Sequence, residues 1–192
     1  MNKVLVIGAH EDDESFGALG TLLKRKAQGA RFHFLWFCDG RQSSGEYPVV
    51  DFFEASYSHA HYADQMLDTS AIKELILRVE EAVALFNPTT VYMPFIGDLN
   101  CDHRLVAEAA MVACRPYKEG APKEVWMYAI DGTTELGPRE FKVDREEKID
   151  AVKKEELIRK WYPHELTSGR NSIKNTEVFE RWPRQLERSS KQ

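Results

Sequence analysis

Residues 4–14 read VLVIGAHEDDE, and here an apolar strand runs directly into a cluster of charged side chains. The run Val4–Ile7 ends at a Gly8-Ala9 pair, and one imidazole and four carboxylates follow at positions 10–14. In an open α/β sheet, ligands bind at the carboxyl end of such a strand. Negative charge beside a core strand is unfavourable unless a cation or a bound proton compensates it. We therefore expect a functional site at this turn.

Strands and helices alternate along the rest of the chain in the pattern that we predict. Strands are expected at 3–8, 32–37, 89–95, 125–130 and 140–143, and helices at 14–28, 49–62, 70–86, 105–114, 144–161 and 175–188. This alternation implies βαβ units and a mostly parallel sheet, so the predicted fold class is α/β, a three-layer Rossmann-like fold. No repeat or linker divides the chain, which favours a single domain over 1–192 with a flexible tail from about residue 185.

Composition narrows the classes of function. The formal net charge of −5 argues against a nucleic-acid surface, which needs clustered Lys and Arg. No apolar run approaches the length of a membrane span, and no signal peptide is evident. Three cysteines (Cys38, Cys101 and Cys114) without CxxC spacing predict free thiols in a reducing compartment. We expect a cytoplasmic protein that binds a small molecule; whether it forms a homo-oligomer stays open.

A second polar cluster, residues 98–103, follows a later predicted strand. Right-handed crossovers bring such strand ends to the same edge of the sheet. Helix capping explains either cluster equally well alone, because acids stabilise a first helical turn. Together, His10, Asp13 and His103 suit a catalytic zinc with an open position for water. Non-haem Fe(II) oxygenases use the same ligand types, but commonly on double-sheet β folds, so zinc is favoured.

The two motifs resemble those of the LmbE-like, or PIG-L, family of zinc-dependent N-deacetylases. AHEDDE at 9–14 is similar to that family's AHPDDE signature, and GDLNCDHRLVAEAA at 97–110 is similar to its second signature, in which an Asp-His pair opens a helix. Weaker similarities extend the resemblance over about residues 3–168. The resemblance implies an LmbE-like deacetylase domain.

The resemblance also implies roles for individual residues. His10, Asp13 and His103 would bind one Zn²⁺ per chain, with Fe²⁺ or another divalent ion as the alternative. Asp12 would be the general base, taking a proton from the zinc-bound water that attacks the amide and returning it to the leaving amine. Glu14 and Asp102 would lie behind the ligands and orient them. The implied substrate is an N-acetylated amino sugar, such as N-acetylglucosamine, or its conjugate.

Two positions depart from the family pattern. Glu11 stands where the family has proline, which loosens the turn and adds a negative charge. Asn100 stands where many relatives carry a histidine that stabilises the oxyanion; Asn can donate only a neutral hydrogen bond. His164, in a segment similar to the family's tail motif, could supply a cationic donor instead. Arg41 is a candidate substrate-binding residue through its guanidinium.

His59 and His61 form a further pair that could bind metal. Two residues apart, they would face different sides of a helix, although the same face of a strand. Because we predict this segment to be helical or irregular, we do not count them as ligands.

Two other functions stay open at this stage. One is a zinc amidase that acts on a non-sugar acyl conjugate. The other is a catalytically degenerate, metal-assisted sugar-binding module, which the departures at Glu11 and Asn100 motivate. A dinucleotide-binding enzyme is disfavoured, because the first turn carries acids where phosphate-binding glycines would stand.

Overall fold

A computed structural model describes residues 2–39, 47–168 and 173–183 of the chain. The strands are β1 (Lys3–Gly8), β2 (Arg31–Cys38), β3 (Ser56–Tyr62), β4 (Thr90–Pro94), β5 (Glu124–Tyr128), β6 (Arg145–Lys148) and β7 (Thr176–Trp182). The helices are α1 (Asp13–Gly17), α2 (Leu19–Ala27), α3 (Pro48–Phe53), α4 (Ile72–Phe86), α5 (Cys101–Ala113) and α6 (Ala151–Trp161), with 3₁₀ turns η1 (Leu67–Thr69) and η2 (Glu165–Ser168). The tail expected from residue 185 lies outside the described residues.

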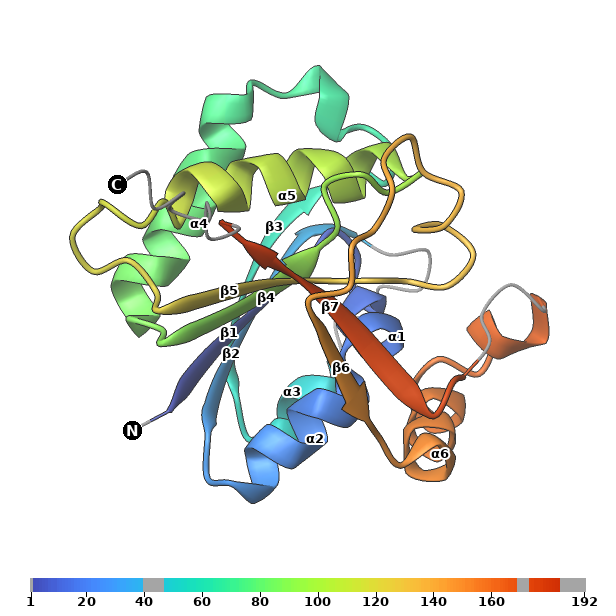
Figure 1. Ribbon diagram of the computed structural model, residues 1–192. Coiled ribbons are helices and arrows are strands. Elements are labelled where there is room, and N and C mark those ends of the chain that lie inside the picture. Colours follow the sequence, from blue (N-terminus) through green and yellow to red (C-terminus); the bar gives the residue numbers. More distant parts are fainter. Residues whose placement is uncertain (1, 40–46, 169–172, 184–192) are drawn as a thin grey trace, which may run out of the picture.

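The strands form one mixed sheet in the order β3-β2-β1-β4-β5-β7-β6 (Figure 1). The first five strands in this order pair in parallel, and β7 pairs antiparallel with both β5 and β6. The chain builds the sheet outward from β1 in one direction and then, from β4, in the other. The crevice between the carboxyl ends of β1 and β4 is therefore the topological switch point, where such folds bind ligands. The predicted α/β, mostly parallel fold is confirmed.

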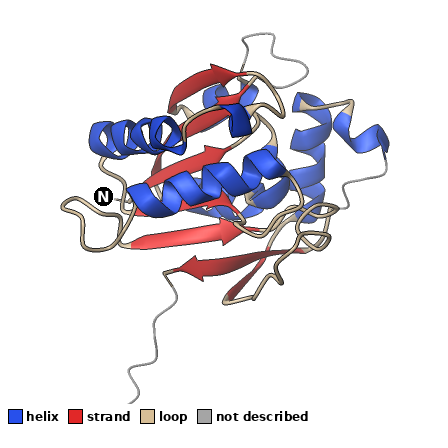
Figure 2. Ribbon diagram, turned by 90° about the horizontal axis from the view of Figure 1, so that it is seen from above, coloured by secondary structure: helices blue, strands red, loops and turns tan. Residues whose placement is uncertain are grey.

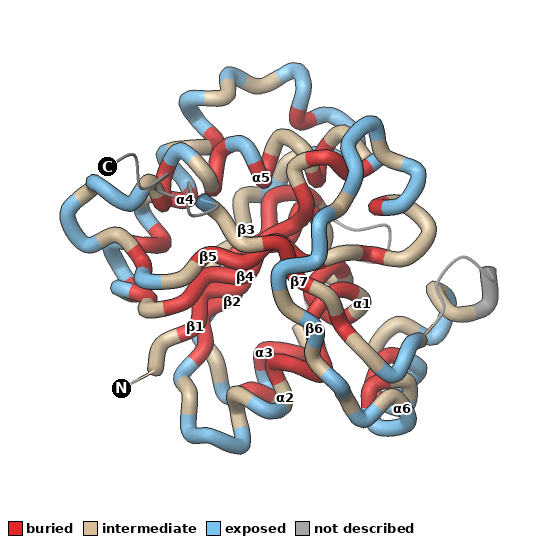
Figure 3. Tube along the Cα trace, viewed as in Figure 1, coloured by how far each residue is buried: buried red, intermediate tan, exposed pale blue. Residues whose placement is uncertain are grey.

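Helices cover both faces of the sheet (Figures 1 and 2). Alternate side chains of β1 point to opposite faces: Leu5 and Ile7 pack in the core with α4 and α5, whereas Val4 and Val6 pack with α2, α3 and α6. The central strands are buried along most of their length (Figure 3). This double burial explains why parallel strands read as continuous apolar runs. No helix among the described residues has the length and apolar character needed to cross a membrane.

The helix predicted at 14–28 is divided into α1 and α2 at Ala18, whose φ is −142°. The Glu177 carboxylate of β7 accepts hydrogen bonds from the backbone N–H groups of Gly20 and Thr21, at 2.8 Å each. It thereby caps the start of α2, a role usually filled by a residue just before the helix. A residue 156 positions away starts this second helix, so no local signal could reveal the break.

Three predicted elements near the sheet edges are wrong. The helix expected at 49–62 is short α3 followed by strand β3, and the helix expected at 175–188 is strand β7. The strand expected at 140–143 is β6, displaced to Arg145–Lys148. These strands are partly exposed and rich in charged or polar side chains, so they lack the apolar runs that identified β1, β2 and β4. Helix α5 also begins four residues earlier than predicted, and α6 begins seven residues later.

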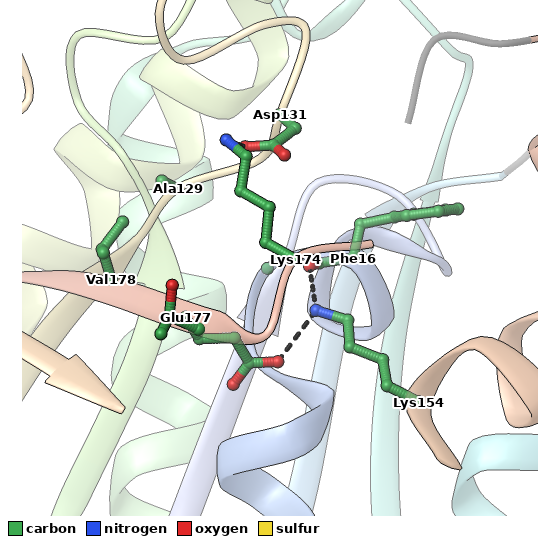
Figure 4. A pocket seen from close by; sticks show the side chains of 9 residues that line it. Phe16, Ala129, Asp131, Lys154, Lys174, Glu177 and Val178 are labelled. Atoms are coloured by element: carbon green, nitrogen blue, oxygen red, sulfur yellow. Dashed lines mark hydrogen bonds and ion pairs between the residues drawn. The ribbon is translucent and has the colours of Figure 1, made fainter. Parts of the chain in front are cut away.

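A buried ion pair joins the C-terminal elements to the first helices (Figure 4). Lys154 of α6 is only 4% exposed, and its ammonium lies 2.8 Å from Glu177 Oε1. The same ammonium donates to the carbonyl oxygen of Phe16 in α1 at 2.5 Å. Figure 4 shows both contacts beside a small pocket lined by Lys174 and Asp131. The pair holds α6 and β7 against the helix that follows the acidic turn.

Replacing Lys154 by Met should destabilise the protein by about 3 kcal/mol, because Glu177 would stay buried without its cation. The control is Lys153→Met on the exposed side of the same helix, where the ion pair with Glu156 is worth at most about 1 kcal/mol. Urea unfolding of both variants measures the difference. Equal free energies of unfolding would show that the buried pair does not stabilise the fold.

Candidate metal centre

The turn after β1 holds the Asp13 carboxylate in a fixed orientation. Asp13 Oδ2 accepts hydrogen bonds from the backbone N–H groups of Ala9 at 2.7 Å and His10 at 2.9 Å. Its second oxygen, Oδ1, lies 3.0 Å from His103 Nε2 and 3.6 Å from His10 Nδ1. The backbone of the turn thus fixes one carboxylate oxygen and leaves the other between two imidazoles.

The end of β4 and the start of α5 bring His103 to this carboxylate. Asn100 is the N-cap of α5, and its amide oxygen accepts from the backbone N–H of Asp102 at 2.9 Å. His103 follows in the first turn and is buried. Its Nδ1 lies 3.1 Å from Asp98 Oδ1. The hydroxyls of Thr133 and Thr134 donate to the other oxygen of Asp98, at 3.0 and 2.7 Å, and fix it in turn.

His10 has its own carboxylate partners at the nitrogen remote from Asp13. His10 Nε2 lies 3.0 Å from Asp64 Oδ1 and 3.5 Å from Asp102 Oδ2. Asp102 also accepts from the backbone N–H of Gln65 at 2.8 Å. Both imidazoles therefore have a carboxylate on the nitrogen that faces away from Asp13, the arrangement that typically orients metal-binding histidines.

The residues present fit a divalent metal. One ligand atom each from His10, Asp13 and His103 can be chosen so that all lie within 4.8 Å of one another. Two imidazole nitrogens and one carboxylate oxygen leave a coordination position open for water, as in catalytic zinc sites. An overlapping group, His10, Cys38 and Asp102, meets the same distance criterion. Burial, followed by the charge of Asp102, raises the pKa of the Cys38 thiol above its usual range, which disfavours the thiolate that a metal would need.

The charges at this centre strongly favour a cation. Burial opposes protonation of His10, but contacts with Asp102 and Asp13 outweigh it and raise the pKa of His10 to about 11. Burial likewise opposes protonation of His103, and Asp13 and Asp98 outweigh it and raise the pKa of that residue to about 9. Protons thus compensate the buried carboxylates when no metal does. Metal binding would release them, since a ligating imidazole must be neutral.

Asp12 and Glu14, on either side of Asp13, have different surroundings. Asp12 is half-buried at the N-cap of α1, and burial together with the charge of Asp13 raises its pKa to about 7. Glu14 is fully buried and accepts hydrogen bonds from Trp36 Nε1 and the Ser15 hydroxyl, each at 2.9 Å. Burial raises the pKa of Glu14 to about 8 despite these two donors. Of the two, Asp12 is the carboxylate with access to solvent.

The remaining candidate residues are placed less centrally. The side-chain oxygen of Asn100 caps α5, so only the amide N–H groups of this side chain remain as donors for a substrate. His164 is exposed, but the chain brings its segment to the acidic turn: the Tyr162 hydroxyl donates to the Glu11 carbonyl oxygen at 2.5 Å. Arg41 lies outside the described residues.

Sequence reasoning missed two carboxylates of this centre. Asp98 belongs to the second polar cluster, and its position five residues before His103 could have identified it as the partner of that imidazole. Asp64 follows β3, which was predicted as helix, so no signal placed it beside His10.

Comparisons with known proteins show which family and which solved structures this chain resembles. The family model described as "PIG-L: GlcNAc-PI de-N-acetylase" matches residues 5–114, more than half of the chain. This stretch includes most of β1, all of β4 and all three proposed ligands. No curated protein sequence matches the chain significantly.

Several solved structures share the fold at low identity. The 4-carboxy-2-hydroxymuconate hydratase GalB of Pseudomonas putida KT2440 is 18% identical over 95% of this chain and 96% of its own, with a TM-score of 0.69. The N,N'-diacetylchitobiose deacetylase of Pyrococcus horikoshii is 16% identical over 95% of this chain and 84% of its own, with a TM-score of 0.69. A zinc-inhibited form of the teicoplanin deacetylase Orf2 is 12% identical over 95% and 100%, with a TM-score of 0.60.

Replacing Asp98 by Asn should weaken Zn²⁺ binding at the His10, Asp13 and His103 centre by about 10- to 100-fold, because a neutral amide orients His103 less strongly. Competition with a chromophoric chelator measures this affinity. Asp68→Asn, which changes an exposed carboxylate in η1, is the control. Unchanged affinity in the Asp98 variant would mean that this contact does not position the imidazole.

Proposed function

The chain belongs to the PIG-L family, and from this membership we propose that it is a metal-dependent hydrolase that removes the N-acetyl group of an amino sugar or amino-sugar conjugate. The observation that carries the proposal is the meeting of His10, Asp13 and His103 at the switch point of the sheet, next to half-buried Asp12. We also propose that the protein works as a single domain, in the cytoplasm, on a small-molecule substrate.

A zinc ion at His10, Asp13 and His103 would supply a Lewis acid and acidify a bound water; Fe²⁺ or another divalent ion is the alternative. The protein fixes these side chains in advance. The backbone of the turn holds Asp13, while Asp98 orients His103, and Asp64 and Asp102 orient His10. Such orientation keeps ligand geometry constant while charge moves during a reaction.

Asp12 is the residue proposed to move the proton. It adjoins a ligand in the chain and is half-buried, whereas Asp13, Glu14, Asp98 and Asp102 are buried and engaged in hydrogen bonds. A carboxylate beside the metal can accept a proton from the attacking water and return it to the leaving amine. One residue would thus serve as base and then as acid.

Stabilisation of the oxyanion and binding of the sugar are proposed for residues farther from the turn. The Asn100 N–H donors and the His164 imidazole are candidates for contacting the carbonyl oxygen, and Arg41 for contacting the sugar. Glu14 is proposed to support the turn from behind, through Trp36 of β2.

Replacing Asp12 by Asn should lower acetate release by about 10²- to 10⁴-fold, because the amide cannot accept the proton. Metal content, measured by elemental analysis, should be unchanged, since Asp12 is not among the proposed ligands. Asp51→Asn, which changes an exposed carboxylate of α3, should retain full activity. Wild-type rates in the Asp12 variant would remove it from the mechanism.

A substrate panel separates the proposed reaction from its alternatives. We expect acetate release from N-acetylglucosamine or its conjugates, a substrate class supported by the diacetylchitobiose and teicoplanin deacetylases that share the fold. Hydrolysis of non-sugar acyl conjugates alone would indicate the amidase. Hydration of an unsaturated carboxylate without acetate release would favour the reaction type of the hydratase that shares the fold. Sugar binding without turnover would indicate a degenerate binding module.

A further inference from the structure

A second cluster of metal-ligating side chains lies on the edge strand β3. The segment that we predicted as helix is this strand, so His59 and His61 can turn toward the same partner. The strand is irregular there: Trp36 of β2 pairs with His59, but Cys38 pairs with Tyr62, which leaves an extra residue in β3. His61 has a φ of 58°, a left-handed conformation that is unfavourable for histidine. Such bulges often re-aim side chains near functional sites.

Asp39, directly after β2, completes the cluster. Its Oδ1 lies 2.8 Å from His61 Nδ1 and 3.7 Å from His59 Nδ1. The two imidazole rings stack with their centroids 4.1 Å apart. One ligand atom from each of these three residues can be chosen so that all lie within 4.8 Å of one another.

Hydrogen bonds set the His59 imidazole in the tautomer that a metal requires. The backbone N–H of His61 donates to His59 Nδ1 at 3.0 Å, so this nitrogen carries a lone pair. The proton is then on Nε2, which lies 3.1 Å from Glu11 Oε1. Glu11 thus contacts the outer nitrogen of His59, as Asp98 contacts the outer nitrogen of His103. Glu11 is the residue that replaces the family's proline, and this contact gives it a structural partner.

We propose that Asp39, His59 and His61 form a second metal site, which binds Zn²⁺ or a similar late first-row transition-metal dication. Glu11 orients His59 within this site. Two imidazoles and one carboxylate suit zinc and its neighbours, whereas Mg²⁺ and Ca²⁺ prefer oxygen ligands. Binding exchanges the hydrogen bond from the His61 N–H to His59 Nδ1 for a metal–nitrogen bond, and water completes the coordination.

The two histidines of the cluster differ strongly in their exposure to solvent. The His59 side chain is 1% exposed and held by Glu11, whereas the His61 side chain is 62% exposed. One ligand is therefore preorganised, and another is open to incoming cations. The cluster shares no ligand with the His10, Asp13 and His103 centre, so either site can be emptied without removing a ligand of the other.

The experiment counts zinc ions bound to the full chain after removal of metal with a chelator. Equilibrium dialysis against Zn²⁺, followed by elemental analysis, should give two ions per chain for the wild type and one for His61→Ala. His103→Ala should also retain one, and the double variant none. His164→Ala, which removes an exposed histidine outside both clusters, should retain two. Asp39→Asn repeats the test with a second ligand.

Two results would overturn the site: a single zinc ion in the wild type, or two in both His61→Ala and Asp39→Asn. In the His103→Ala background, Glu11→Gln should weaken the remaining zinc site about tenfold; unchanged affinity would refute the role of Glu11. Equal binding of Mg²⁺ in that background would refute the assignment to zinc-type cations. None of these measurements depends on deacetylase activity.

Discussion

The contacts of the Asp13 carboxylate are the interaction on which the rest of the structure depends. One oxygen closes the turn after β1 by accepting two backbone N–H groups, and the other meets the imidazoles of His10 and His103. The same residue begins α1, so local backbone structure and the candidate centre share one side chain. Because His103 comes from α5, this carboxylate also joins the two halves of the sheet across the switch point.

The sheet and its outer elements keep that arrangement rigid. Parallel strands deliver the two polar segments to one edge, and the buried carboxylates Asp98 and Asp102 behind the imidazoles limit how the rings can turn. Next to the centre, Glu177 and Lys154 hold α1 and α2 against β7 and α6. The centre is therefore positioned by contacts far apart in the sequence, which suits chemistry that needs fixed geometry.

Buried parallel strands and the segments that follow them could be predicted from the sequence, because apolar runs ending in acids and histidines are local signals. Helix α5 and its Asp102-His103 pair were recognisable for the same reason. Strands β3 and β7 could not be predicted, since their partly exposed, polar residues obtain their structure from pairing with β2 and β5. Missing β3 concealed both the contact of Asp64 with His10 and the approach of His59 to Glu11.

The bulge in β3 has a consequence for association between molecules. β3 ends the sheet on one side, and an edge strand with regular unpaired N–H and C=O groups is a template for strand addition by another chain. The left-handed residue His61 interrupts that regular ladder near the end of the strand. The distortion that gathers two histidines thus also disfavours edge-to-edge aggregation, so a binding cluster and protection against misassembly occupy the same few residues.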